Sequence, residues 1–355
     1  MCRTRRDSTA GQAHGNEFKE EVEIMKKKGV GMSCVLHPTG NKGAGDPSQA
    51  AIQLKPDGTF TLVTGAVDLG QGSSTILRQF AADELGVPIE NITVNNSAGN
   101  AAPVTMGSFA SRVTLIDPHA VKLAAEDLKA QICKWAAAQF GVNPDDVTFA
   151  DNKVAVKNDP AKSLTMAEVG AGVFNSPALM IGTGAWYPAP FTAHDPETGA
   201  MPSVGAVSFG ACYLELEVDT ETGVVDILKL VQAWEVGKAV NPLMCKMQIG
   251  GGLSIGLGYA LSEECWPHAP SMDFVPEVLG DYFIPTFADY PLENERAVAE
   301  VPHPMGVKGA KGFSEGSSTA PIPAIIAALH DALGVWITEI PVTPEVILRA
   351  LGARG

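Results

Sequence analysis

Residues 211–236 read ACYLELEVDTETGVVDILKLVQAWEV, and apolar and polar side chains alternate along both halves of this stretch. The alternation runs on both sides of Thr220-Glu221-Thr222-Gly223, which predicts two antiparallel strands joined by a turn. A glycine-rich helix is expected over residues 241–264, where missing side chains let neighbouring backbone or a ligand approach closely. A hairpin followed by a helix is the first sign of an α+β fold.

The rest of the chain repeats this mixture. Residues 51–63, AIQLKPDGTFTLV, alternate around Asp57-Gly58 and predict another hairpin. Residues 174–203 are rich in Gly, Pro and aromatic side chains, and we expect an extended surface connection there. Apolar spacing and the placement of Gly and Pro predict one more strand and three more helices, at residues 92–95, 73–85, 118–140 and 323–333.

These elements place the chain in the α+β class, with two αβ lobes. Its 355 residues are 45% hydrophobic, which is enough for a large buried core. Only 18% are charged, so we expect partner subunits to cover part of the surface. Residues 1–24 are polar and are expected to be a flexible tail, and residues 25–355 are expected to form one domain of two interleaved lobes.

The net charge of −15 disfavours binding to nucleic acid or to an anionic membrane. The polar start lacks the apolar core of a secretory signal, and residues 249–261 are too short and glycine-rich to span a bilayer. We therefore expect a cytoplasmic protein.

The six cysteines are scattered and contain no C-x-x-C pair, so their spacing indicates neither a disulfide framework nor an iron–sulfur or zinc site. His37, His303 and His330 lack metal-ligand spacing, and neither G-x-S-x-G nor H-E-x-x-H occurs. No residue of this chain is therefore expected to ligate a metal.

Three loops are candidates for ligand binding. In the first, residues 68–75 (DLGQGSST), two glycines flank Gln71 directly before a predicted helix, whose N-terminal N–H groups and dipole favour an anion or a polar ring. The loop lacks the third glycine of a dinucleotide fingerprint and the lysine of a P-loop. An ordinary tight turn with a serine cap is the alternative.

The second loop, residues 105–112 (TMGSFASR), places small residues and hydroxyl groups beside Arg112. Short side chains would let backbone donors reach a planar ligand. The alternative is a capped turn with Arg112 in a surface ion pair.

The third loop lies in residues 306–330, GVKGAKGFSEGSSTAPIPAIIAALH, where Glu315 stands among Gly309, Gly312 and Gly316. Glycine allows the backbone to be drawn against a ligand, and a partly shielded carboxylate there can act as a general base near neutral pH. The alternative is a solvated loop glutamate.

Taken in order, these loops resemble the molybdopterin-binding half of the molybdenum hydroxylases, the family of xanthine dehydrogenases and aldehyde oxidoreductases. The resemblance covers residues 28–351 and is carried by residues 67–88, 107–114, 235–264, 281–291 and 307–348. Five collinear motifs are far more specific than any one of them.

The resemblance implies that Glu315 is the general base beside the metal and that Gln71 and Gln248 contact the pterin. The residues that it implies for cofactor binding are Gly70, Gln71, Gly72, Ser73, Ser108, Phe109, Ala110, Ser111, Arg112, Gln248, Lys311 and Gly312. The chain departs from the family pattern at Met247, Ile255 and Ser314.

The resemblance further implies a catalytic subunit that hydroxylates an N-heteroaromatic or aldehyde substrate with oxygen from water. Its cofactor would be molybdopterin with molybdenum, in the cytosine dinucleotide form. Because the family's catalytic subunits are longer, the resemblance implies a larger molybdopterin subunit that supplies the other half of the molybdenum site, as in nicotinate dehydrogenase. An iron–sulfur subunit and an FAD subunit would complete the complex.

Two alternatives remain open. The segment GSFASRVTL and the hairpin region also resemble the 4-hydroxybenzoyl-CoA reductase branch, which would make the reaction reductive. A non-catalytic structural subunit is the other alternative, and the intact Glu315 speaks against it.

Overall fold

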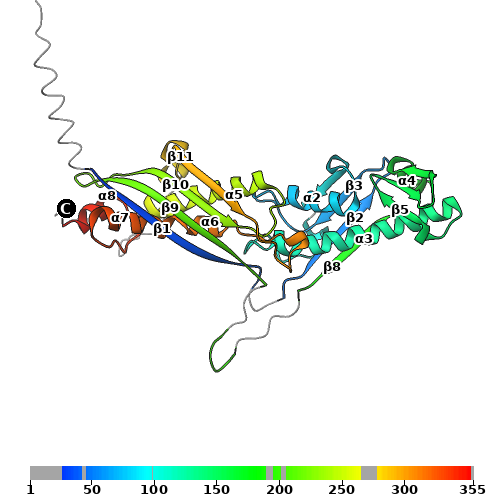
Figure 1. Ribbon diagram of the computed structural model, residues 1–355, viewed down its shortest axis with the longest axis horizontal. Helices are drawn as coiled ribbons and strands as arrows, with labels where there is room; N and C mark the ends of the chain where they lie inside the picture. The colour runs from blue at the N-terminus through cyan, green and yellow to red at the C-terminus, as the bar shows by residue number, and fades with distance from the viewer. Residues whose placement is uncertain are drawn as a thin grey trace, which may run out of the picture.

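The structure is a computed structural model that describes residues 26–41, 45–97, 99–188, 195–200, 205–264 and 278–352. The tail expected over residues 1–24 lies outside the described residues. Two helix-covered sheets lie end to end along the long axis of the molecule (Figure 1). Together with helices and mixed strand pairing, they confirm the α+β class.

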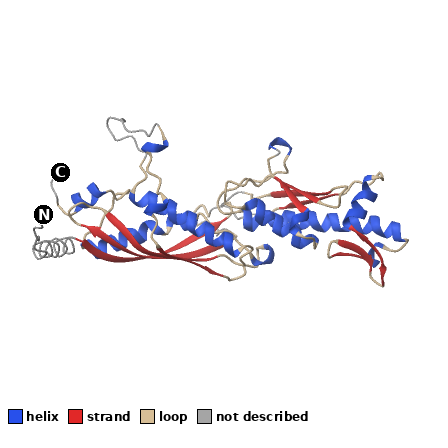
Figure 2. Cartoon of the chain, turned by 90° about the horizontal axis from the view of Figure 1, so that it is seen from above, coloured by secondary structure: helices blue, strands red, loops and turns tan. Residues whose placement is uncertain are grey.

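Lobe I, residues 26–39, 205–264 and 278–352, is built on a four-stranded sheet in the order β1-β9-β10-β11. The strands β9 and β10 form the predicted hairpin, in which Val218 faces Val225. Helices pack on one face of this sheet, as Figure 2 shows. The elements are β1 (Lys26–Thr39), β9 (Ala206–Asp219), β10 (Val225–Glu235), β11 (Glu293–Ala299), α5 (Pro242–Leu261), α6 (Gly316–Thr319), α7 (Pro321–Leu333) and α8 (Pro344–Ala350).

Lobe II, residues 45–97 and 99–188, is inserted between β1 and β9. Its sheet has the order β4-β3-β2-β8, and a small sheet β5-β6-β7 lies at the far end. The elements are β2 (Ser48–Leu54), β3 (Phe60–Thr64), α2 (Ser73–Leu85), β4 (Ile92–Asn95), α3 (Val113–Phe140), β5 (Val147–Ala150), β6 (Lys153–Val156), β7 (Asp159–Thr165), α4 (Met166–Phe174) and β8 (Ile181–Trp186).

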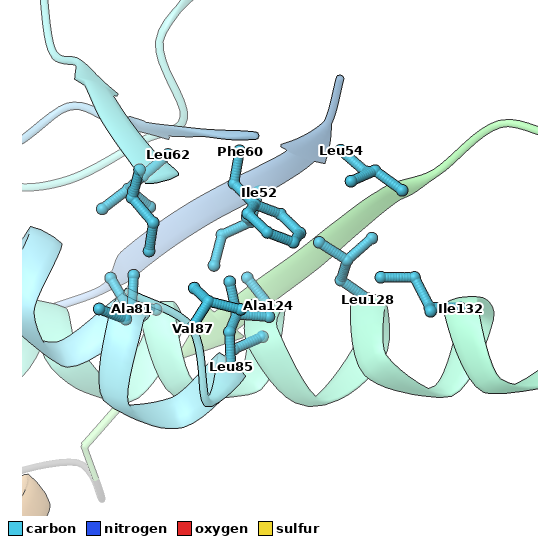
Figure 3. Close-up of a cluster of buried hydrophobic side chains, with 14 of the residues drawn as sticks. Ile52, Leu54, Phe60, Leu62, Ala81, Leu85, Val87, Ala124, Leu128 and Ile132 are labelled. Carbon is cyan, nitrogen blue, oxygen red and sulfur yellow. The ribbon is translucent and has the colours of Figure 1, made fainter. Parts of the chain in front are cut away.

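Each lobe has its own hydrophobic core. In lobe II, Ile52 and Phe60 point from the sheet toward Leu128 on α3 (Figure 3). Two residues of the C-terminal segment, Val307 and Ala310, belong to this core although the flanking strands and helices belong to lobe I. The two lobes are therefore joined by shared apolar packing as well as by the chain.

The predicted hairpin β2–β3 and the helices α2, α5 and α7 are present close to their expected bounds. Gly86 ends α2 in the left-handed conformation, as the sequence indicates. Helix α3 begins at Val113, earlier than the expected start at residue 118, because the ion pair between Arg112 and Asp117 fixes this turn.

The expected surface connection over residues 174–203 is partly wrong, because β8 is a strand of the lobe II sheet. Its glycines suggested a loop, but they make room for α3. A Cβ at Gly182 would overlap the backbone carbonyl of Ala124. In the same way, a Cβ at Gly31 of β1 would overlap the carbonyl of Ala324 on α7. Both helices thus pack against a strand at a distance that only glycine permits.

Replacing Gly182 by Val should push α3 away from the sheet and lower the free energy of unfolding by about 1–3 kcal/mol or more. Thermal and urea unfolding would measure the loss. Thr183→Val, on the exposed face of the same strand, is the matched control and should be nearly neutral. Equal effects of the two substitutions would contradict close packing at Gly182.

Candidate functional site

A cavity of about 490 Å³ opens between the lobes. Lobe II contributes the two loops around Gln71 and Phe109, and lobe I contributes α5 and the loop that carries Glu315. The predicted site residues that line it are Gln71, Ser73, Ser108, Phe109, Ser111, Arg112, Gln248, Lys311, Gly312 and Glu315. Of the remaining three, Ala110 contacts Glu315, and Gly70 and Gly72 flank Gln71 in its turn.

Glu315 is held by groups from both lobes. Its Oε1 accepts a hydrogen bond of 3.0 Å from the backbone N–H of Ala110. Its Oε2 lies 3.4 Å from Ser111 Oγ and 3.5 Å from His37 Nε2. The side chain is 50% exposed, which agrees with the partial shielding expected from the sequence. The carboxylate is fixed in direction while one side stays open to the cavity.

The backbone that holds Glu315 is strained. Ala110 and Ser111 have φ of 48° and 50°, a left-handed conformation that is uncommon outside glycine. The opposing loop comes so close that a Cβ at Gly312 would overlap the carbonyl oxygen of Ser111. The carbonyl of Gly312 is itself fixed by Thr39 Oγ1 at 3.0 Å and Ser208 Oγ at 2.7 Å.

Arg112 is fully buried and is not in the surface ion pair that the sequence left open. Its guanidinium bonds Asp46 at 2.5 Å and Asp117 at 3.0 Å. It also donates to Thr105 Oγ1 at 2.7 Å and to the carbonyl of Gly107 at 3.0 Å. Burial raises the pKa of Asp117, although the positive charge of Arg112 opposes that rise. These bonds show that Arg112 shapes its loop, and the cofactor contact that the resemblance implies for it stays a prediction.

The loop before α2 also differs from expectation, because a carboxylate of the chain already occupies the helix N-terminus. Asp68 accepts hydrogen bonds from the backbone N–H groups of Gly70, Gly72 and Ser74 at 2.9, 3.1 and 3.0 Å. Gln71 is turned back onto its own loop, where its amide bonds the carbonyl of Val67 at 2.9 Å. The helix end is therefore not a free anion site.

Lys311 is buried and neutralised. Its ammonium is ion-paired with Glu235 and donates to the carbonyl of Val207 at 2.5 Å. It also lies 5.9 Å from the centre of the Phe209 ring. Lys311 thus joins β9 and β10 to the floor of the cavity rather than presenting a free charge.

Helix α5 forms one wall. Its residues at intervals of four, Leu243, Met247, Gly251, Ile255 and Tyr259, lie on one exposed or cavity-facing stripe. A Cβ at Gly251 would meet no atom within 4 Å, so this glycine leaves a hollow in the cavity wall. Gln248 lies half-buried beside it.

The sequence indicated neither the hydrogen bonds of Asp68 nor the contact between His37 and Glu315, although His37 was a candidate to face the pocket. Asp68 lies five residues before the first residue of α2, whose N-cap position is Gly72, so it does not stand where the usual capping signal is found. The approach of His37 to Glu315 has no local signal, because the two residues meet only when β1 packs beside α6.

Within the described ranges, no group of three or more His, Cys, Asp or Glu side chains is placed to hold a metal ion. No helix in this part of the chain is long and apolar enough to cross a membrane.

A family model described as molybdopterin cofactor-binding domain matches residues 2–291. The chain belongs to this family. The carbon monoxide dehydrogenase large chain of Hydrogenophaga pseudoflava is 29% identical over 314 residues, which are 87% of this chain and 38% of that one. A probable hypoxanthine oxidase of Escherichia coli K12 is 30% identical over 327 residues, which are 91% of this chain and 32% of that one.

Among solved structures, the aldehyde oxidoreductase from Desulfovibrio gigas is similar to the domain with a TM-score of 0.74 and 28% identity. The match covers 96% of this chain and 34% of that one. These findings confirm the resemblance to the molybdenum hydroxylases. The molybdopterin-binding domain described here spans between 32% and 38% of the length of the two curated relatives.

The residues of the cavity fit the flat pterin group that this family binds. Gly251 leaves its hollow in one wall, and the Phe109 ring and Ile255 supply apolar surface. The volume suits a small-molecule site. Gln248, Ser108 and the backbone around Ser111 offer polar atoms at its edge.

Removing the Asp68 carboxylate tests the helix cap. Burial opposes its ionisation, but the backbone hydrogen bonds from Ser74, Gly70 and Gly72 prevail and keep the pKa of Asp68 below its usual value. Asp68→Ala should lower the free energy of unfolding by about 1 kcal/mol at pH 7.

Because the pKa of Asp68 is lowered in the folded state, its stabilisation is present above the unfolded value near 4 and is lost as the pH falls through the folded value. The gap between variant and wild type in urea unfolding should therefore hold from pH 7 to about 4.5 and shrink below that. A gap that widens toward acid would contradict the cap.

Proposed function

We propose that this chain forms one side of the active site of a molybdenum-dependent hydroxylase, with Glu315 as its general base. One observation carries the proposal: a carboxylate is fixed at the mouth of a cavity of cofactor size by a strained backbone N–H from the opposite lobe. A general base must be held in hydrogen-bonding reach of the proton that it accepts, and the hydrogen bond from Ala110 fixes the orientation of the Glu315 carboxylate.

The residues of the chain have distinct tasks in this proposal. Gln248, Gly251 and the loop around Ser108 and Ser111 would hold the molybdopterin, which supplies the redox centre when bound. His37 would hold Glu315 in direction. Oε1 accepts the hydrogen bond of 3.0 Å from Ala110, whereas Oε2 has only the longer contacts of 3.4 and 3.5 Å with Ser111 and His37. The half-exposed carboxylate can therefore receive a proton on Oε2 and release it to water.

An N-heteroaromatic compound or an aldehyde is the proposed substrate class. One relative is named for hypoxanthine, an N-heteroaromatic compound, and one solved structure is named for aldehydes. Both kinds of substrate have an electron-poor carbon that accepts oxygen derived from water. The cofactor is proposed to be in its cytosine dinucleotide form.

A second polypeptide surface is proposed to complete the site. The rim of the cavity is apolar and exposed at Leu69 (74%), Phe109 (40%), Ile255 (46%) and Tyr259 (48%). Apolar surface of this kind around a cavity marks an interaction site. We propose a larger molybdopterin subunit as its partner, with iron–sulfur and FAD subunits carrying the electrons away.

Replacing Glu315 by Gln should reduce turnover at least about a hundredfold, since the amide keeps the shape of the side chain but accepts no proton. Molybdenum and pterin content of the purified complex should stay unchanged. Glu345→Gln, at an exposed position on α8, is the control with normal turnover. Turnover near the wild-type value in Glu315→Gln would instead favour the structural-subunit alternative.

Replacing Gly251 by Val should fill the hollow in the cavity wall and lower the pterin content of the complex severalfold, since the pterin and the new side chain would compete for the same space. Pterin released from the denatured protein is measured by fluorescence. Met247→Val, which places the same β-branched side chain on the same helix outside the cavity, is the control and should leave the pterin content unchanged. Full pterin content in Gly251→Val would place the cofactor elsewhere.

A further inference from the structure

Both lobes are built in the same way, but their open sheet faces differ in chemistry. In lobe II the face away from α3 mixes polar side chains, such as Gln49, Gln53 and Thr183, with small or half-buried apolar ones such as Ala51 and Val63. In lobe I the open face of the β1-β9-β10-β11 sheet is largely apolar. The strands of the lobe I sheet expose large apolar side chains, including Met32, Leu36 and Phe209, whereas the four strands of the main lobe II sheet expose none.

Strand register places the apolar residues in rows that cross the lobe I sheet. One row joins Cys34 on β1, Ala211, Ala233 and Ala297 on β11. It contains no charged side chain. All four side chains are exposed or half-exposed, because the alternate residues of each strand face the core.

The rows on either side continue this surface. Nearer the cavity, Leu36 pairs with Phe209, and these side chains are 60% and 55% exposed. On the far side, Met32, 66% exposed, pairs with Tyr213, which pairs with Val231. A contiguous apolar surface of this size is uncommon on an uncovered sheet and marks an interaction site.

One end of this apolar surface lies next to the cavity. Phe209 lies against the ammonium of Lys311 in the cavity floor, and His37 follows Leu36 directly in β1. A polypeptide that covers this face would therefore reach the rim of the site.

Next to the cavity, Glu235 of β10 is ion-paired with the buried Lys311, and the other charged side chains of this face lie toward the far end of the sheet. There, Glu215 lies between Val30 and Lys229, and Lys229 pairs with Glu293. Glu295 stands beside Val231 in the neighbouring row. Acidic side chains outnumber basic ones among these positions, so a basic flank on the partner would complement them. A second copy of this chain would instead bring a further net charge of −15 against the same face.

We propose that the open face of the lobe I sheet, the surface centred on Met32, Cys34 and Phe209, docks a different polypeptide whose contact surface is apolar with a basic flank. This inference rests on the proposed function only in that the partner is taken to be the subunit that completes the site. The bound partner covers Cys34 and places its basic flank opposite Glu293 and Glu295.

Cys34 reports directly on this face because its thiol is exposed in the middle row. The complex is purified through a tag on this chain and treated with N-ethylmaleimide, beside the same chain purified alone. Peptide mass spectrometry follows modification of Cys34. Labelling should be at least about tenfold slower in the complex, as expected for the dry centre of an interface. Equal labelling in both samples, or a chain that purifies without any partner, overturns the proposal.

Substitutions then test the chemistry of the partner. Met32→Glu should weaken the complex at least about tenfold in a dissociation assay, because it places a charge in the apolar centre. Gln53→Glu, on the open sheet face of lobe II, is the matched control and should leave the complex intact. Circular dichroism of each free variant checks the fold, and the Cys34 measurement stands without any variant.

Replacing Glu293 and Glu295 together by Lys should slow association at low salt and reduce its salt dependence, since like charges would then meet. An unchanged salt dependence refutes the basic flank. Size-exclusion chromatography of the free chain completes the test. A dimer of the free chain that Met32→Glu dissociates would show that a second copy, and not a different polypeptide, covers this face. None of these readouts uses turnover or cofactor content, so their failure is separable from failure of the proposed function.

Discussion

A guanidinium enclosed between two carboxylates determines the geometry of the cavity. Arg112 is fully buried, and it binds Asp46 before β2 and Asp117 in the first turns of α3. A buried charge is costly unless it is fully paired, so this triad allows little variation in its arrangement. Its hydrogen bonds hold the loop from Thr105 to Arg112 in one conformation. They thereby offset the energetic cost of the left-handed backbone at Ala110 and Ser111.

Because of this constraint, groups from both lobes contact the carboxylate of Glu315. The strained loop directs the N–H of Ala110 toward Glu315. Because residue 312 is glycine, the loop that carries Glu315 can pack directly against the backbone of Ser111. Strain at such a place is held by the surrounding bonds, here those of Arg112 on one side and of Thr39 and Ser208 on the other. The cavity thus lies between the two lobes and not within either one.

Much of the fold was predictable because its signals are local. The alternation around residues 220–223 and the apolar spacing of α2 report which face of each element is buried. The elements that were missed have weaker local patterns. Strand β8 carries glycines that are also typical of loops, and β1 carries Gly29 and Gly31, because both strands lie directly against a helix at these glycines.

The sequence by itself determined the fold class and the family, and it indicated Glu315 as the candidate base, because these inferences depend on periodicity and on motifs within short stretches. Only the tertiary structure decided what the charged and polar residues do. Arg112 became a buried support, Asp68 filled the helix end that had been expected to take a ligand, and His37 came to rest beside Glu315. These pairings, and the contrast between one mixed and one largely apolar open sheet face, follow from distant segments packing together, and no local pattern encodes them.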